Sequence, residues 1–83
     1  MTLEQMFGSI LCQVRKSKNI SQEQLGSLSG YHRTYVSLLE RGHKSPSLVT
    51  IFKLAEALDI KASLLIEQVE VGVQKDTDQD ENI

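Results

Sequence analysis

The 83-residue sequence has no tryptophan, one cysteine and one proline. The single cysteine, Cys12, excludes an intramolecular disulfide framework and suits a reducing compartment, so we expect a cytoplasmic protein. No apolar run approaches the roughly 20 residues of a membrane span. The opening MTLEQMFGSI also lacks the basic and apolar regions of a secretion signal. The sequence therefore predicts neither membrane insertion nor export.

Residue types that bind metals or catalyse reactions are present without the required spacing. His32 and His43 have no Cys or acidic partner at the spacing of a zinc site. No Gly-rich phosphate loop and no strand–turn–helix elbow frames the Ser and carboxylate side chains. Cys12 has no resolving cysteine, so an inert thiol is expected. We therefore expect no enzyme activity, no cofactor, no metal and no small-molecule ligand.

The net charge of −2 is unevenly distributed along the chain. Residues 71–83 hold one Lys against Asp76, Asp78, Asp80 and Glu81. Residues 15–44 hold six basic residues against two Glu. Because charge contacts act over about a Debye length of 8–10 Å, the local sign decides which partners bind. The overall acidity is therefore weak evidence against nucleic-acid binding.

Apolar residues recur at helical spacing, and capping residues divide the chain into five helices. Thr2 with Gln5, and Ser21 with Gln24, have the spacing of capping boxes. We expect helices after Thr2, from Ser21 to about Ser29, from about His32 to Arg41, after Ser47, and from about Ala62 to Gln68. Asn19, Gly30 and Gly42 are expected in left-handed backbone at helix ends.

Two helices have apolar faces that the spacing assigns to the core. The predicted inward set is Leu3, Phe7, Leu11 and Val14 in the first helix, and Leu48, Ile51, Phe52, Ala55 and Leu58 in the fourth.

The segment from Ser21 to Gly42 has the pattern of a helix–turn–helix. Gly26 is small enough for two helices to cross closely, and Gly30 occupies the turn. The apolar contacts that fix the angle of the pair are expected from Leu25, Tyr31, Val36 and Leu39. An ordinary helical hairpin in another bundle is the alternative, since such pairs occur in unrelated folds.

SQEQLGSLSGYHRTYVSLLERG followed by PSLVTIFKLAEALDI resembles the helix–turn–helix family of the phage Cro and cI repressors, the XRE family, over about residues 5–66. The resemblance implies an all-α, five-helix, lambda-repressor-like DNA-binding domain. HRTYVSLLERG is most similar to the controller proteins of restriction–modification systems, which are small autoregulatory dimers. Arg15 and Glu40 resemble the family's buried ion pair. His32 departs from the family, which usually places a Ser, Thr or Asp cap there.

DNA-contacting residues follow from the motif. Arg33 and Thr34 begin the recognition helix, and Arg33 can pair bidentately with guanine O6 and N7. Ser37 and Leu38 face the same side and are weaker base-reading candidates. Exposed residues without a DNA role are the alternative for each. Phosphate contacts are predicted for Gln22, His32, Tyr35, Arg41, His43, Lys44 and Ser45.

The domain is expected over residues 1–68, with a C-terminal extension at 69–73 and a disordered acidic tail at 74–83. VEVGV alternates like a short strand, which either pairs with a two-fold mate or folds back on Met6 and Ile10. A dimer interface is predicted at Ile60, Leu64, Leu65, Ile66 and Val69.

The sequence therefore predicts a homodimeric regulator that binds a palindromic operator in double-stranded DNA, with the controller of a restriction–modification system as a narrower hypothesis. The alternative is an antitoxin-like or adaptor module whose helix–turn–helix mainly binds a protein partner. The acidic tail is compatible with that alternative.

Overall fold

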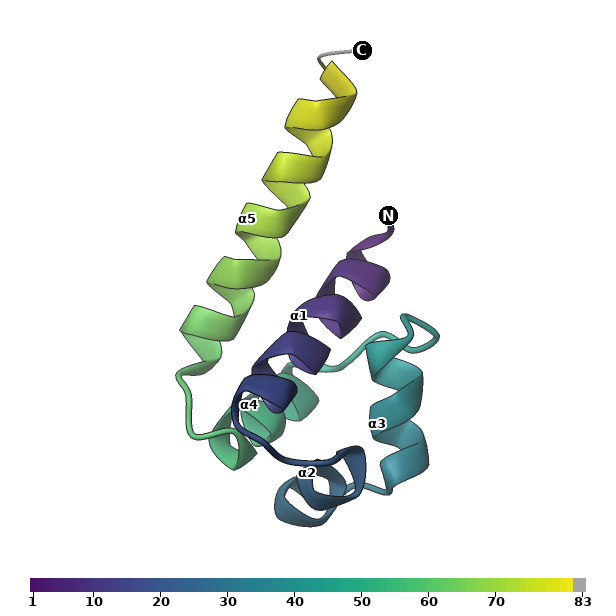
Figure 1. Ribbon diagram of the computed structural model, residues 1–83, viewed down its shortest axis with the longest axis vertical. Helices are drawn as coiled ribbons and strands as arrows, with labels where there is room; N and C mark the ends of the chain where they lie inside the picture. Colours follow the sequence, from purple (N-terminus) through teal and green to yellow (C-terminus); the bar gives the residue numbers. More distant parts are fainter. Residues whose placement is uncertain (82–83) are drawn as a thin grey trace.

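Five helices form the part of the chain that the structure, a computed structural model, describes: the backbone of residues 1–81 and the side chains of residues 1–76. They are α1 (Leu3–Ser17), α2 (Gln22–Ser29), α3 (Arg33–Glu40), α4 (Leu48–Ala57) and α5 (Ala62–Glu81), shown in Figure 1. No strand occurs over these residues. The predicted all-α class and the order of five helices are confirmed. No helix in residues 1–81 has the length and apolarity to cross a membrane.

The helix ends follow the capping signals in the sequence. The Thr2 side chain accepts a hydrogen bond from the backbone N–H of Gln5, and the Ser21 side chain accepts one from Gln24. In return, the Gln5 and Gln24 side chains accept the backbone N–H of Thr2 and of Ser21, respectively. Gly30 and Asn19 adopt left-handed backbone with φ of 84° and 59°. These bonds satisfy N–H groups that have no partner within the helix. Local chemistry therefore explains where α1 and α2 begin and end.

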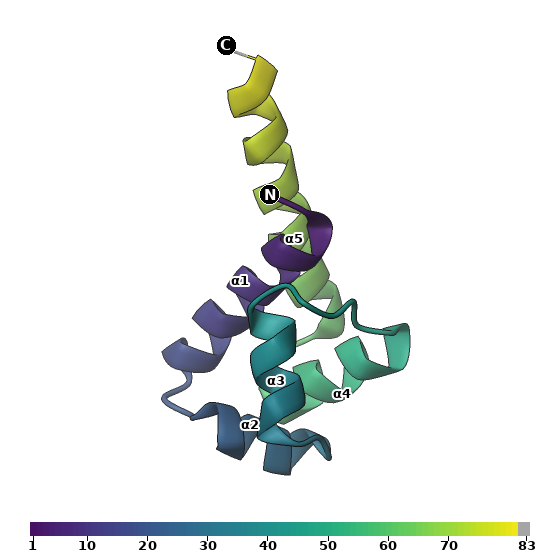
Figure 2. The same ribbon diagram turned by 90° about the vertical axis from the view of Figure 1, so that its right-hand side faces the viewer.

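The core is built around α1, which packs against both α3 and α5 (Figures 1 and 2). Side chains from all five helices meet in this core. α2 packs against α4 at the end of the molecule away from the two chain termini (Figure 1). The core side chains are Phe7, Leu11, Val14, Leu25, Val36, Leu39, Leu54, Leu58, Leu65 and Val69. Because α1 contacts both neighbours, it fixes α3 relative to the C-terminal helix.

The predicted inward face of α4 is partly wrong. Leu48 is 70% exposed and Phe52 is 59% exposed, whereas Leu54 is fully buried. Leu3 of α1 is also exposed. The inward face of α4 carries Thr50, whose hydroxyl lies 2.9 Å from the Tyr31 hydroxyl. That polar contact lets a hydrophilic residue be buried and turns the Leu48–Phe52 stripe outward.

The C-terminal segment also differs from the prediction, because α5 continues without a break through residues 69–81. Val69 and Val73 lie one turn apart and pack toward the core, while Val71 is exposed. Gly72 lies so close to Met6 that an added Cβ would sit 2.5 Å from its sulfur. The segment folds back on α1 as a helix, not as a strand, because helical spacing puts Val69 and Val73 on one face. Of the predicted tail, 74–81 are helical and 82–83 lie outside the described residues.

α1 approaches the end of α3 closely at Gly8. A Cβ there would lie 2.6 Å from the Glu40 carbonyl oxygen and closer still to that of Leu39. We expect Gly8→Ala to lower the free energy of unfolding by about 1–3 kcal/mol, since backbone atoms must move to accept the methyl group. Urea unfolding followed by circular dichroism measures this change.

Gly72→Ala is the matched control. Its Cβ meets only the flexible end of Met6, and alanine favours a helix interior. It should therefore be tolerated. Equal unfolding midpoints for Gly8→Ala and the unmodified protein would contradict the close packing of α1 on α3.

Candidate nucleic-acid interface

The α2–α3 pair is held by contacts that leave one side of α3 exposed. Leu25, Val36 and Leu39 are fully buried beneath the pair. A Cβ on Gly26 would lie 2.6 Å from the Tyr31 carbonyl oxygen, so only glycine allows this crossing. Figure 2 shows α3 on the face toward the viewer, with α2 below it and α5 behind. The arrangement presents one face of α3 to a large ligand.

The leading edge of α3 contains the predicted base-reading residues. Arg33 and Thr34 are exposed at its first turn, and Ser37 and Leu38 are partly exposed one turn later. Val36 and Leu39 point inward, so the helical period directs Arg33, Thr34 and Ser37 to the opposite side. The Arg33 Nη1 atom lies 3.4 Å from Oε2 of Glu23 on α2. Sequence reasoning did not identify this ion pair.

His32 caps α3. Its Nδ1 atom accepts the backbone N–H of Thr34 at 3.0 Å. An imidazole nitrogen therefore replaces the hydroxyl or carboxylate oxygen that usually accepts this bond. The departure from the family's usual Ser, Thr or Asp cap therefore still leaves the N-terminus of α3 with a side-chain acceptor.

The other predicted phosphate-contacting residues fall into two groups. Arg41, His43, Lys44 and Ser45 are exposed at the end of α3 and in the following loop. Tyr35 is partly buried, with its ring centroid 5.0 Å from that of Tyr31. Its aromatic ring therefore also supports the turn between α2 and α3.

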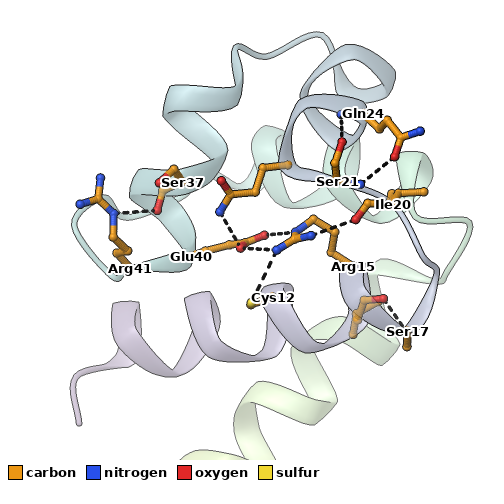
Figure 3. Close-up of polar contacts among 11 residues, drawn as sticks. Cys12, Arg15, Ser17, Ile20, Ser21, Gln24, Ser37, Glu40 and Arg41 are labelled. Atoms are coloured by element: carbon orange, nitrogen blue, oxygen red, sulfur yellow. Dashed lines mark hydrogen bonds and ion pairs between the residues drawn. The ribbon is translucent and has the colours of Figure 1, made fainter.

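Glu40 connects three helices through its carboxylate (Figure 3). Arg15 donates from Nε at 2.6 Å and from Nη2 at 3.0 Å, and Gln22 donates from Nε2 at 2.9 Å. Arg15 also bonds the Ile20 carbonyl oxygen at 2.9 Å. The pair expected from the sequence is present, and the structure adds Gln22 to it. This bond fixes the Gln22 amide at the N-terminus of α2.

The charge state of this network follows from its contacts. Burial alone raises the pKa of the Glu40 carboxyl, but hydrogen bonds from Arg15 and Gln22 and the Arg15 charge bring that pKa below its usual range. The hydrogen bond to Glu40 raises the pKa of Arg15. Both groups are therefore charged at neutral pH and stabilise the junction of α1, α2 and α3.

The predicted dimer residues do not lie on a single exposed surface. Leu65 and Val69 are buried in the core of their own chain, so they are unavailable to a partner. Leu64 and Ile66 are exposed, and Ile60 is partly buried. The exposed Leu48 and Phe52 of α4 share a shallow apolar groove with Ile66 of α5. Consecutive residues of a helix point in different directions, which is why Leu64 and Ile66 are exposed while Leu65 between them is buried.

No group of three or more His, Cys, Asp or Glu side chains that could hold a metal ion occurs in the described part of the chain. The exposed edge of α3 instead carries a guanidinium and hydroxyl groups. Hydrogen-bonding groups of these kinds are the ones that contact base edges and phosphates.

Comparisons with known proteins agree with this geometry. The helix–turn–helix family model matches residues 13–65. The control protein C.BamHI from Bacillus amyloliquefaciens is 40% identical over 68 residues, covering 81% of this chain and 84% of the relative. The crystal structure of the restriction–modification controller protein C.AhdI from Aeromonas hydrophila is 48% identical, with a TM-score of 0.73, covering 75% of this chain and 94% of that one.

A more distant structure extends the similarity to almost the whole chain. The clp gene regulator ClgR from Corynebacterium glutamicum has a TM-score of 0.89 at 22% identity, covering 98% of this chain and 86% of that one. At this identity the likeness shows the fold alone.

Glu40→Gln should destabilise the protein by about 3 kcal/mol at neutral pH, because Arg15 then keeps a buried charge without its partner. The lowered pKa of Glu40 in the folded state sets the sign of the pH effect. Its stabilisation is present above the pKa of the unfolded chain and is lost as pH falls through the lower folded value.

The difference in unfolding free energy between the two proteins should therefore shrink in acid. Urea unfolding at a series of pH values measures it. A difference that stays constant down to the acid limit would contradict the role of the Glu40 charge.

Proposed function

The chain belongs to the helix–turn–helix family of DNA-binding transcriptional regulators, and we propose that it binds a palindromic operator as a homodimer. The observation that carries this proposal is the exposed leading edge of α3 above a fully buried Val36 and Leu39. A major groove of about 12 Å admits a helix presented in this way. Two such helices related by a two-fold axis read half-sites about 34 Å apart.

Each side chain at the edge of α3 has a role in the proposal. Arg33 donates two hydrogen bonds to guanine O6 and N7, and the Thr34 hydroxyl or methyl contacts the neighbouring base. Ser37 and Leu38 reach the next base pair, with Leu38 suited to a thymine methyl group. Base contacts of this kind determine the sequence that is bound.

Backbone contacts flank these readers. The Gln22 amide, held by Glu40, and the N–H groups at the start of α2 face one phosphate. Arg41, His43, Lys44 and Ser45 contact the backbone at the other end of α3. His32 and Tyr35 support the helix and contribute contacts from its edge. Together they supply affinity and register without sequence information.

The homodimer uses the apolar surface formed by Leu48, Phe52 and Ile66. These exposed side chains lie on α4 and α5, which leaves the leading edge of α3 free. Exposed apolar surface of this kind is typical of association sites. The proposed interface therefore omits Leu65 and Val69, because both side chains are buried in the core.

The named relatives support a narrower role. The control protein C.BamHI and the restriction–modification controller C.AhdI are 40% and 48% identical to this chain over most of their own lengths. We propose that this chain likewise controls a restriction–modification gene set, including its own promoter. Neighbouring endonuclease and methyltransferase genes, together with binding to the intervening DNA, test that role.

Arg33→Ala should remove the preference for the DNA upstream of its own gene. Affinity for that duplex should fall about 10- to 100-fold, since one bidentate base contact is lost, while affinity for random duplex changes little. Fluorescence anisotropy with the two duplexes measures both affinities.

Lys44→Ala is the matched control. Loss of a phosphate contact should weaken binding to both duplexes equally and lower the slope of log affinity against log salt by about 1. If the Arg33→Ala protein kept its sequence preference, Arg33 would not be a base-contacting residue. Absence of any preference in the unmodified protein would favour the protein-interaction alternative.

Phe52→Glu should convert the dimer to a monomer, because a charge replaces an apolar side chain at the interface. Sedimentation equilibrium measures the molecular mass. Leu28→Glu is the control, since Leu28 is similarly exposed but lies on α2. A Phe52→Glu protein that sediments as a dimer would show that another surface joins the subunits.

A further inference from the structure

Glu23 is the exposed carboxylate beside the proposed base-reading residue. It lies in the first turn of α2, next to Gln22, and its Oε2 atom is 3.4 Å from Arg33 Nη1. The side chains of Arg33 and Glu23 are 66% and 74% exposed. The other acidic residue of α2 and α3, Glu40, is buried and bound by Arg15. Glu23 is thus the exposed acidic residue of the α2–α3 pair.

A carboxylate in the first turn stabilises α2 through the helix dipole, but neither its contact with Arg33 nor its effect on DNA follows from that. Solvent-exposed ion pairs contribute little to folding, because water and salt screen them. A negative charge also repels the phosphates that supply most of the affinity for DNA. Its contact with the Arg33 guanidinium, in contrast, bears directly on how that side chain is used.

The chemistry of guanidinium allows Arg33 to contact Glu23 and a base together. It carries five N–H donors in a planar fork. Glu23 occupies one donor on Nη1, and guanine O6 and N7 need two. A phosphate can use the same remaining donors, but the Glu23 carboxylate repels its negative charge. The ion pair is therefore compatible with base reading and opposed to indiscriminate phosphate binding.

We propose that Glu23 is a positioning residue that sets DNA specificity: it holds the Arg33 guanidinium toward base edges and weakens binding where Arg33 meets only phosphates. This inference rests on the proposed function. In this proposal Glu23 increases the difference between the affinity for the operator and the affinity for other DNA.

Glu23→Gln tests this role with two probes. One is the duplex that the unmodified protein enriches most from a random pool, and the other is a scrambled duplex of equal length and composition. Affinity for the scrambled duplex should rise about fivefold, the upper range for losing one exposed charge contact. Affinity for the enriched duplex should not rise, so the ratio of the two affinities falls about fivefold.

Asp59→Asn is the matched control. It removes the same charge from the α4–α5 loop, which lies on the side of the molecule away from α3 (Figure 1). Asparagine also tolerates the left-handed backbone of Asp59, whose φ is 55°. This variant should leave the affinity ratio unchanged, and circular dichroism checks that both variants are folded.

The Arg33→Ala background separates positioning from simple repulsion. There, Glu23→Gln should leave the affinity for the scrambled duplex nearly unchanged, because no guanidinium remains for the carboxylate to hold away from phosphates. Equal gains on both duplexes, or a gain of the same size on the scrambled duplex without Arg33, would show simple repulsion and overturn the inference.

The same experiments distinguish its failure from that of the proposed function. If the unmodified protein enriches no sequence, both the proposed function and this inference fail. If it enriches a sequence and Glu23→Gln keeps the affinity ratio, only the role of Glu23 is refuted.

Discussion

The interaction on which the rest of the structure depends is the ion pair between Arg15 and Glu40. It joins α1 to the end of α3, and Gln22 extends it to the start of α2. A buried ion pair stabilises only when its geometry and hydrogen bonds offset the loss of water. Here both carboxylate oxygens are bonded, so the charges can be buried and three helices share one junction. The orientation of α3 follows from that junction.

Local signals in the sequence predicted most of the fold. Capping boxes, left-handed Asn19 and Gly30, and the buried Val36 and Leu39 all depend on residues near one another in the chain. The inward face of α4 could not be predicted in the same way. Its apolar residues cover more than one side, and the buried side contains the Tyr31–Thr50 contact, which joins the turn between α2 and α3 to α4. Residues 74–81 at the polar end of α5 are likewise helical, although their composition predicted disorder.

The candidate site shows the same division between local and distant information. Exposure of Arg33 and Thr34 follows from the helical period and from the motif. The Glu23–Arg33 pair and the Gln22–Glu40 bond depend on the angle between α2 and α3, which is set by close contact at Gly26. The sequence contains the charges, but their distances come from packing. Leu65 and Val69 illustrate the converse, since packing removes them from the surface.

The histidine cap of α3 has a consequence for proton placement. A ring nitrogen that accepts a backbone N–H cannot carry a proton, so the Thr34 bond selects the imidazole tautomer protonated on Nε2. A serine cap leaves its hydroxyl proton free to rotate. His32 instead presents an N–H of fixed direction from an exposed ring at the start of α3. One side chain thus accepts from the helix with one nitrogen and offers a donor to solvent or phosphate with the other.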